Sequence, residues 1–90
     1  MSPDFAEAHN NLGDVLQELD RFDEAEASLI QAIRLMPSLA NAHSNLGITL
    51  QRMGKLEKAE ESYAKAIKLN PNYAENYNNL GNTLQGLSRL

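Results

Sequence analysis

The amino-acid sequence predicts an all-α fold, a right-handed α-solenoid of antiparallel helix-turn-helix repeats. The 90-residue chain repeats itself with a period of 34 residues, which is clearest at Pro3, Pro37 and Pro71. Within each period, apolar residues recur at the three- and four-residue intervals typical of amphipathic helices. A fixed period of this size marks a stacked array, in which each unit buries its apolar face only against its neighbours. The chain holds about two and a half such units.

The first repeat, residues 6–39, reads as two amphipathic helices separated by a turn. One apolar stripe identifies the first helix: Ala8, Leu12, Leu16 and Leu19. Asp20 and Arg21 interrupt this stripe, and a second stripe starts at Phe22. We expect Pro37 to end the second helix, because proline lacks the backbone N–H that a helix requires.

The second repeat, residues 40–73, follows the same plan. Its two helices are predicted at about 38–53 and 56–69. Gly54 lies between them, and glycine tolerates the left-handed conformation that often follows the end of a helix.

Three glycines recur inside the first helix of each unit, as Gly13, Gly47 and Gly81. Glycine inside a helix costs about 0.5–1 kcal/mol relative to alanine. A cost that recurs in every unit needs a steric reason, so we expect the partner helix to approach closely at these positions. Ala25 and Ala59 in the facing helices are the expected contacts.

The chain finishes with a partial repeat, residues 74–90, which supplies a single helix at about 72–87. All units belong to one domain, residues 1–90. Terminal repeats normally present a polar outer face, so an apolar one suggests either a longer array or self-association through this last helix. The apolar stripe concerned consists of four leucines: Leu80, Leu84, Leu87 and Leu90.

The composition excludes several classes of function. The chain has no cysteine, which excludes disulfides, thiolate metal sites and a cysteine nucleophile and suits a reducing compartment. Its formal net charge of −4 disfavours nucleic acid, whose phosphates require a basic stripe. No apolar run reaches the length of a membrane span, and the N-terminus lacks the pattern of a signal peptide. We expect a cytoplasmic protein without nucleic-acid or membrane partners.

No pattern in the sequence indicates catalysis, a metal or a cofactor. His9 and His43 occupy equivalent positions, but neither has a second ligand at the spacing of a metal-binding turn. Packing between helices is the interpretation that we favour for both. Ser28 and Ser62 have no base in register, so nucleophilic catalysis is unsupported. The sequence therefore predicts a protein that is not an enzyme and uses no cofactor.

These features resemble the tetratricopeptide repeat family. The family pattern has glycine at its eighth position, alanine at the twentieth and twenty-seventh, and proline at the thirty-second. The matching residues here are Gly13, Gly47, Gly81, Ala25, Ala59, Ala32, Ala66, Pro37 and Pro71. The resemblance covers nearly the whole chain and implies a non-catalytic scaffold that binds a protein segment on the concave face of its first helices. Within the family, the Asn-Leu-Gly segments look most like the arrays of O-linked N-acetylglucosamine transferase and its bacterial relatives.

Asparagine recurs at one position of all three first helices, as Asn11, Asn45 and Asn79. In the transferase-like arrays, this asparagine forms a ladder that holds a peptide main chain, and a carboxamide has the donors and the acceptor for that task. Neighbouring helices pack about 8–10 Å apart and an extended peptide advances about 3.3 Å per residue, so one asparagine would meet roughly every third ligand residue. The alternative is that these side chains bond only to neighbouring loops or helices.

Seven further polar residues complete the predicted peptide-binding face: Asn10, Asn78, Gln17, Gln51, Gln85, Asp14 and Arg52. Acidic side chains outnumber Arg52 on this face, which favours a neutral or mildly basic segment as the ligand. A solvated acidic surface that binds nothing is the alternative.

Some relatives hold acidic tails with lysine or arginine at the second and at the fifth or sixth positions of the first helix. We reject that mode of binding, because no cation stands at these positions and like charges would disfavour the contact. They hold Glu7, Asn10, Asn11, Asn41, Ser44, Asn45, Glu75, Asn78 and Asn79.

Two other roles stay open at this point. The array would serve as a structural self-association module if its terminal helices pair with another copy. It would instead be the targeting segment of a larger enzyme, such as a glycosyltransferase, if catalysis lies outside these residues. The identity of the ligand does not follow from the sequence, because a fold of this kind hosts many partners.

Overall fold

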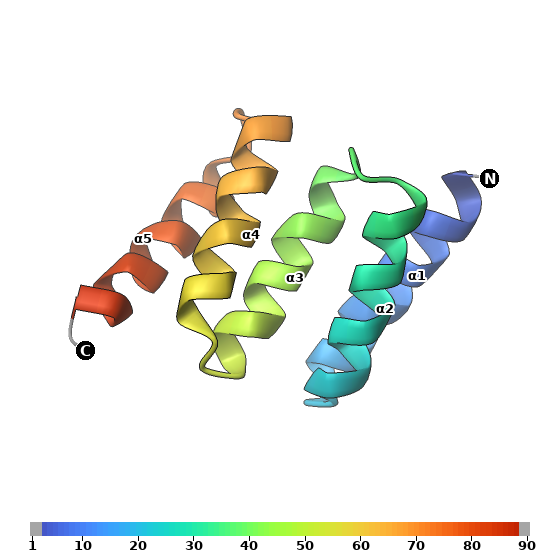
Figure 1. The fold of residues 1–90 in the computed structure, drawn as a ribbon, viewed down its shortest axis with the longest axis horizontal. Helices are drawn as coiled ribbons and strands as arrows, with labels where there is room; N and C mark the ends of the chain where they lie inside the picture. The colour runs from blue at the N-terminus through green and yellow to red at the C-terminus, as the bar shows by residue number, and fades with distance from the viewer. Residues whose placement is uncertain (1–2, 89–90) are drawn as a thin grey trace.

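The computed structural model describes residues 3–88, and this part of the chain is built from helices alone. Successive helices pack side by side and run in alternating directions (Figure 1). The predicted all-α solenoid of antiparallel helix-turn-helix repeats is confirmed. The helices are α1 (Pro3–Glu18), α2 (Phe22–Leu35), α3 (Ala40–Arg52), α4 (Leu56–Leu69) and α5 (Ala74–Ser88).

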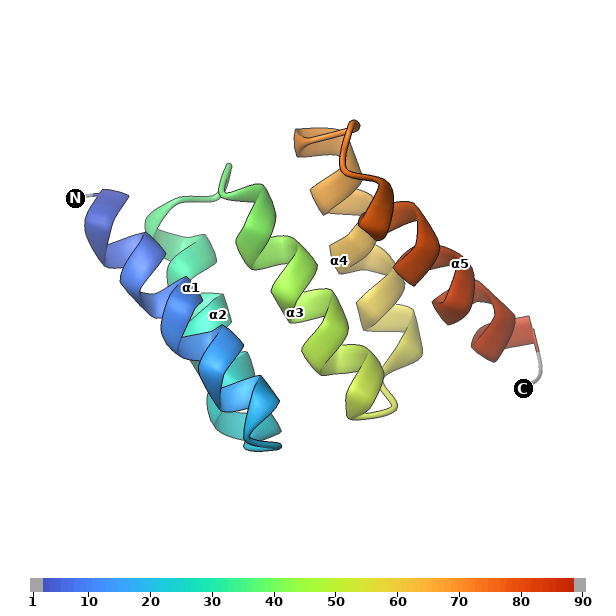
Figure 2. The same ribbon diagram turned by 180° about the vertical axis from the view of Figure 1, so that it is seen from behind.

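The helices form two layers. The first helices of the repeats, α1, α3 and α5, lie on the side seen in Figure 2, with α2 and α4 behind them. Helix α3 contacts both α1 and α5. The array is elongated, with principal extents of 41 × 28 × 17 Å. Three repeats therefore contribute neighbouring side chains to one surface.

The helix boundaries differ from the predicted ones by at most two residues. Helix α4 starts and ends where it was expected, at Leu56 and Leu69. Helices α3 and α5 each begin two residues later than predicted, because two non-helical residues follow each proline before the next helix starts.

The turns inside the two complete repeats use the same backbone conformation. Gly54 has φ 80°, and Asp20, one period earlier, has φ 62°. Both values lie in the left-handed region that follows a helix end, and aspartate is among the residues that tolerate this region best. The expected role of Gly54 in its turn is confirmed.

The glycines inside α1 and α3 do mark a close approach of the partner helix. A Cβ atom on Gly13 would lie 2.5 Å from Leu29 Cγ, and one on Gly47 would lie 2.7 Å from Tyr63 Cε1. Leu29 and Tyr63 are fully buried. The expected alanines are not the nearest contacts, because the large side chain one helical turn further along lies directly over each glycine. The alanines, buried nearby, are Ala25 and Ala59.

Helix α5 lacks such a partner among the described residues. A Cβ atom on Gly81 would meet nothing within 4 Å. Tyr77 and Leu84, on the same side, are exposed. The predicted leucine stripe is only partly open, because Leu80 packs against the core around Tyr63 and Leu87 faces α4. Leu90, the last member of that stripe, lies outside the described residues.

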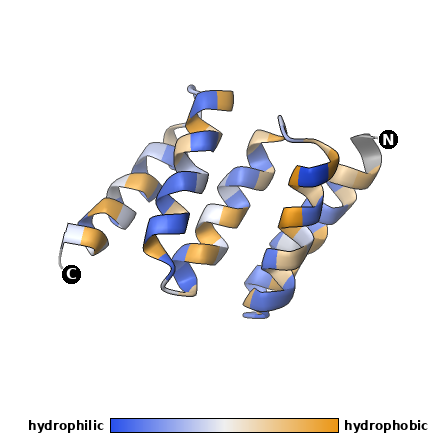
Figure 3. Cartoon of the chain, in the orientation of Figure 1, coloured by the Kyte–Doolittle hydropathy of each residue, from blue (hydrophilic) through white to orange (hydrophobic). Residues whose placement is uncertain are grey.

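The opposite end of the array is also apolar. Four apolar residues here are between 49 % and 61 % exposed: Phe5, Leu12 and Val15 on α1, and Leu19 directly after it. Helix α2 covers the corresponding face of α3, where Ala42 and Thr49 are fully buried. Apolar residues on both outer helices are visible in Figure 3.

Candidate functional site

Two adjoining hollows lie on the surface formed by α1, α3 and α5. We call the first the asparagine hollow; its volume is about 270 Å³, and it is lined by Asn10, Asn11, Asp14, Asn41, Ser44, Asn45, Ile48, Tyr73, Glu75, Asn76 and Asn79. We call the second the arginine hollow; its volume is about 430 Å³, and it is lined by Ile48, Gln51, Arg52, Tyr63, Glu75 and Asn79. Because Ile48, Glu75 and Asn79 line both, the two hollows form one groove.

The structure brings seven of the ten predicted site residues to this groove: Asn10, Asn11, Asp14, Asn45, Asn79, Gln51 and Arg52. Asn78 and Gln85 are exposed and line neither hollow. Gln17 is only 6 % exposed, and its Oε1 atom has no hydrogen-bond partner among the described residues. The groove is thus narrower than the face predicted from the sequence, and the peptide-binding role of all ten residues stays a prediction.

The three repeated asparagines reach the same hollow because the period gives them the same place on successive first helices. Asn45 Nδ2 donates to Asn10 Oδ1 at 2.9 Å and so links α3 to α1. The side chains of Asn11 and Asn79 make no hydrogen bond to another described residue. Local bonding therefore occupies the amide nitrogen of Asn45, whereas the carboxamides of Asn11 and Asn79 stay available to a ligand.

A second hydrogen bond links α3 to α5. Ser44 Oγ donates to Asn76 Oδ1 at 2.7 Å, and Asn76 is only 1 % exposed. The sequence reasoning missed Asn76 as a lining residue. The sequence does contain a signal for Asn76, because the corresponding positions of the other repeats hold alanine, at Ala8 and Ala42. A polar residue at a buried position needs a hydrogen-bond partner.

Acidic side chains stand at two edges of the asparagine hollow. Asp14 lies on α1 and is half-buried, whereas Glu75 lies on α5 and is exposed. Tyr73 Oη donates a hydrogen bond to the Glu75 carboxylate, and this bond raises the pKa of Tyr73. Tyr73 was also missed as a lining residue, although Phe5 and Leu39 at the same repeat position mark it as a recurring large side chain.

The arginine hollow contains a buried tyrosine and one cation. Tyr63 Oη donates to Gln51 Oε1 at 2.8 Å. Burial raises the pKa of Tyr63 to about 12, against the opposing influence of Arg52. Arg52 Nη1 lies 4.0 Å from Asp20 Oδ1 with both side chains more than half exposed. An exposed pair at this distance contributes little to stability, so Arg52 is able to turn toward a ligand.

One of the two histidines makes a hydrogen bond to the backbone. His43 is 7 % exposed, and its Nε2 atom lies 2.9 Å from the Pro37 carbonyl oxygen. Tyr77, at the same repeat position, donates to the Pro71 carbonyl at 2.9 Å. This contact supports packing as the role of His43. Within residues 3–88, no group of histidine and carboxylate side chains is arranged to hold a metal ion.

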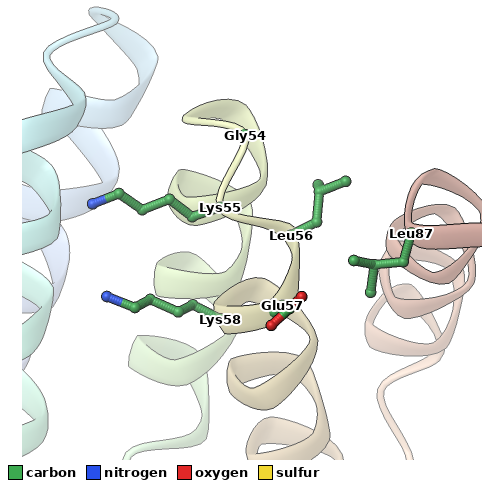
Figure 4. A pocket seen from close by; sticks show the side chains of 6 residues that line it. All are labelled: Gly54, Lys55, Leu56, Glu57, Lys58 and Leu87. Atoms are coloured by element: carbon green, nitrogen blue, oxygen red, sulfur yellow. The ribbon is translucent and has the colours of Figure 1, made fainter. Parts of the chain in front are cut away.

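A third hollow, of about 340 Å³, lies away from the groove, between the start of α4 and the end of α5. Figure 4 shows Leu56 and Leu87 facing each other across it, with the ammonium groups of Lys55 and Lys58 directed away. The corresponding positions in the preceding junction hold Phe22 and Met53. Smaller leucines at the second junction leave the space open.

Comparison with known proteins gives a consistent result. A family model described as "Tetratricopeptide repeat" matches residues 4–70 and 38–90. A structure described as the crystal structure of MamA is 31 % identical, with a TM-score of 0.90 over 97 % of this chain and 51 % of that one. A second MamA structure is 32 % identical, with a TM-score of 0.89 over 92 % of this chain and 45 % of that one.

A peptide complex is also similar. The first TPR of Spaghetti (RPAP3), bound to the HSP90 peptide SRMEEVD, is 29 % identical, with a TM-score of 0.90 over 92 % of this chain and 66 % of that one. No curated protein sequence matches the chain. The chain spans about half the length of the MamA chains. These matches do not support the closer likeness to the transferase arrays that the sequence suggested. No helix in residues 3–88 is long and apolar enough to cross a bilayer.

Proposed function

This chain belongs to the tetratricopeptide repeat family, and we propose that it is a non-catalytic scaffold that binds an extended protein segment along the groove formed by α1, α3 and α5. The observation that carries this proposal is the asparagine hollow, in which Asn11, Asn45 and Asn79 from three repeats line one space of about 270 Å³. The peptide complex of the similar RPAP3 domain supports peptide binding as a use of this fold.

The chemistry of the groove suits a peptide main chain. The free carboxamides of Asn11 and Asn79 each offer donors and an acceptor, so each is able to bond a backbone C=O and a backbone N–H. A neutral hydrogen bond contributes about 0.5–1.5 kcal/mol net, so a few such bonds give weak binding. Because the main chain is the same in every peptide, we expect affinity with little sequence preference.

A double variant tests this proposal. Asn11→Ala with Asn79→Ala removes two carboxamides that have no partner in the described chain, so the fold should be unaffected. We expect capture of peptides from an array of extended segments to fall at least severalfold, measured by fluorescence. The matched control is Asn70→Ala with Asn72→Ala, which removes two exposed carboxamides in the turn before α5. Equal capture by the two double variants would refute the proposed use of the groove.

Self-association is a second candidate, favoured by the apolar ends of the array. Tyr77 and Leu84 are 49 % and 44 % exposed on the side of α5 where α1 and α3 each receive a second helix. A second copy that covers this face would bury them. Sedimentation at high protein concentration should then show oligomers that Leu84→Glu dissociates. A monomer at every concentration would contradict this candidate and leave the peptide-binding proposal intact.

A further inference from the structure

The charges along the groove are unevenly distributed. Asp14 on α1 and Glu75 on α5 line the asparagine hollow from the two helices that flank α3. No lysine or arginine lines this hollow among the described residues. The cation of the groove, Arg52, lies in the arginine hollow. A ligand side chain that enters the asparagine hollow therefore meets carboxylates and no opposing cation.

Two amides inside the same hollow use only their oxygens in hydrogen bonds to other described residues. Asn76 is 1 % exposed, and its oxygen accepts from Ser44, but its amide nitrogen donates to no other described residue. Asn10 is 8 % exposed, and its side-chain oxygen likewise accepts a hydrogen bond, from Asn45. Neither nitrogen belongs to the fully buried atoms that lack a hydrogen-bond partner, so both are open to the hollow and accessible to the carbonyl oxygens of a bound main chain.

We propose that the asparagine hollow selects protein segments that carry lysine or arginine side chains, which pair with Asp14 at one edge of the hollow and with Glu75 at the other. This inference rests on the proposed function, because it assigns charge specificity to the same groove. The Glu75 carboxylate is already oriented by its hydrogen bond from Tyr73. The asparagine hollow holds two carboxylates and no cation of its own, and Arg52 lies with Glu75 only in the arginine hollow, so the asparagine hollow attracts a basic side chain and repels an acidic one.

The peptide bound to the similar RPAP3 domain provides a test of charge selection. The peptide bound to that domain, SRMEEVD, carries three acidic residues and one basic residue. The asparagine hollow of this chain presents carboxylates, so we expect it to reject an acidic peptide. A seven-residue peptide spans about 23 Å when extended, and three successive helices span about 16–20 Å. A peptide of this length therefore reaches across the whole groove.

Three fluorescent peptides of one length test the charge preference: SRMEEVD, the analogue SQMQQVN without charged side chains, and the basic analogue SRMKKVK. We expect the basic peptide to bind more tightly than the neutral one, and the neutral one more tightly than the acidic one. Exposed ion pairs contribute about 0.2–1 kcal/mol each, so two pairs should separate the basic from the neutral peptide by about fivefold. The separation should shrink as salt is added.

A charge-matched pair of variants isolates the two carboxylates. Asp14→Asn with Glu75→Gln should bring binding of SRMKKVK close to that of SQMQQVN and leave binding of SQMQQVN unchanged. Asp23→Asn with Glu61→Gln makes the same change in net charge on α2 and α4, away from the groove, and should leave the preference intact. Thermal melting followed by circular dichroism verifies that both variants are folded.

The possible outcomes separate the charge preference of the asparagine hollow from the proposed binding of a peptide in the groove. Loss of the preference only in the Asp14/Glu75 variant would support the inference. Equal binding of the three peptides, tighter binding of SRMEEVD, or an equal effect of both variants would overturn it and leave the proposed function standing. Failure of all three peptides to bind would overturn the proposed function together with this inference.

Discussion

The middle repeat and the last helix carry the same sequence pattern in opposite surroundings. In α3, Gly47 lies under the ring of Tyr63, which α4 supplies. In α5, Gly81 occupies the same repeat position, and a Cβ atom added there would meet nothing within 4 Å. The difference shows that the repeated glycine leaves room for a side chain of the following helix. It does not stabilise the helix that contains it. Substitutions at the two positions should therefore have effects of opposite sign.

The largest effect is expected from Gly47→Ala. The added methyl group would lie 2.7–2.9 Å from three ring atoms of Tyr63, and that ring is fully buried. Overpacking of this kind costs about 1–3 kcal/mol. Urea denaturation should show a lower free energy of unfolding than for the unmodified chain. An unchanged or raised value would mean that the ring moves aside freely and that the contact is not close.

A smaller effect is expected from Tyr63→Phe. This variant keeps the ring over Gly47 and removes only the hydrogen bond to Gln51 Oε1, which is 2.8 Å long. Losing one such bond costs about 0.5–1.5 kcal/mol. The same denaturation experiment measures it. A loss as large as that of Gly47→Ala would show that the hydroxyl group, and not ring packing, holds α3 and α4 together.

Alkaline pH tests the same tyrosine. Because burial raises the pKa of Tyr63 from 10.0 to about 12, the folded state holds this proton more tightly than the unfolded state does. The resulting stabilisation is fully present below pH 10 and is lost as pH rises from about 10 to 12. The free energy of unfolding should fall over that range, and Tyr63→Phe should weaken the fall. An identical pH profile in both proteins would contradict burial as the cause.

The smallest effect, with the opposite sign, is expected from Gly81→Ala. The methyl group enters open space, and alanine is favoured over glycine inside a helix by about 0.5–1 kcal/mol. The free energy of unfolding should rise by up to that amount. A decrease would indicate that another molecule or segment covers Gly81 in solution, which would favour the self-association candidate.

The sequence predicts the helices of both regions better than it predicts the contacts between them. The period and the apolar stripes gave the helices to within two residues, because both are local properties of the chain. The partners of Gly13 and Gly47 were assigned to the wrong side chains, because helical spacing tells which face a residue occupies and not how far its side chain reaches. Leu29 and Tyr63 supply the three nearest atoms over Gly13 and Gly47 respectively.

The sequence predicted only part of the site, because the groove also depends on contacts between helices. Asn10 lines the groove because α3 lies beside it, but Asn78, at the same repeat position, has no further first helix beside it among the described residues. Gln17 is buried within the array although its sequence position suggested an exposed side chain. The groove forms between repeats, so a residue's place within one repeat does not decide whether it lines the groove.

Amide NMR tests the central claim most directly. The side-chain NH₂ signals of Asn11, Asn45 and Asn79 are to be followed while the peptide SRMKKVK is added to labelled protein. Binding along the groove predicts that these signals shift together and saturate with one dissociation constant, while those of Asn70 and Asn72 stay in place. Shifts confined to the apolar ends, around Leu12 or Leu84, with the groove signals unmoved, would contradict it.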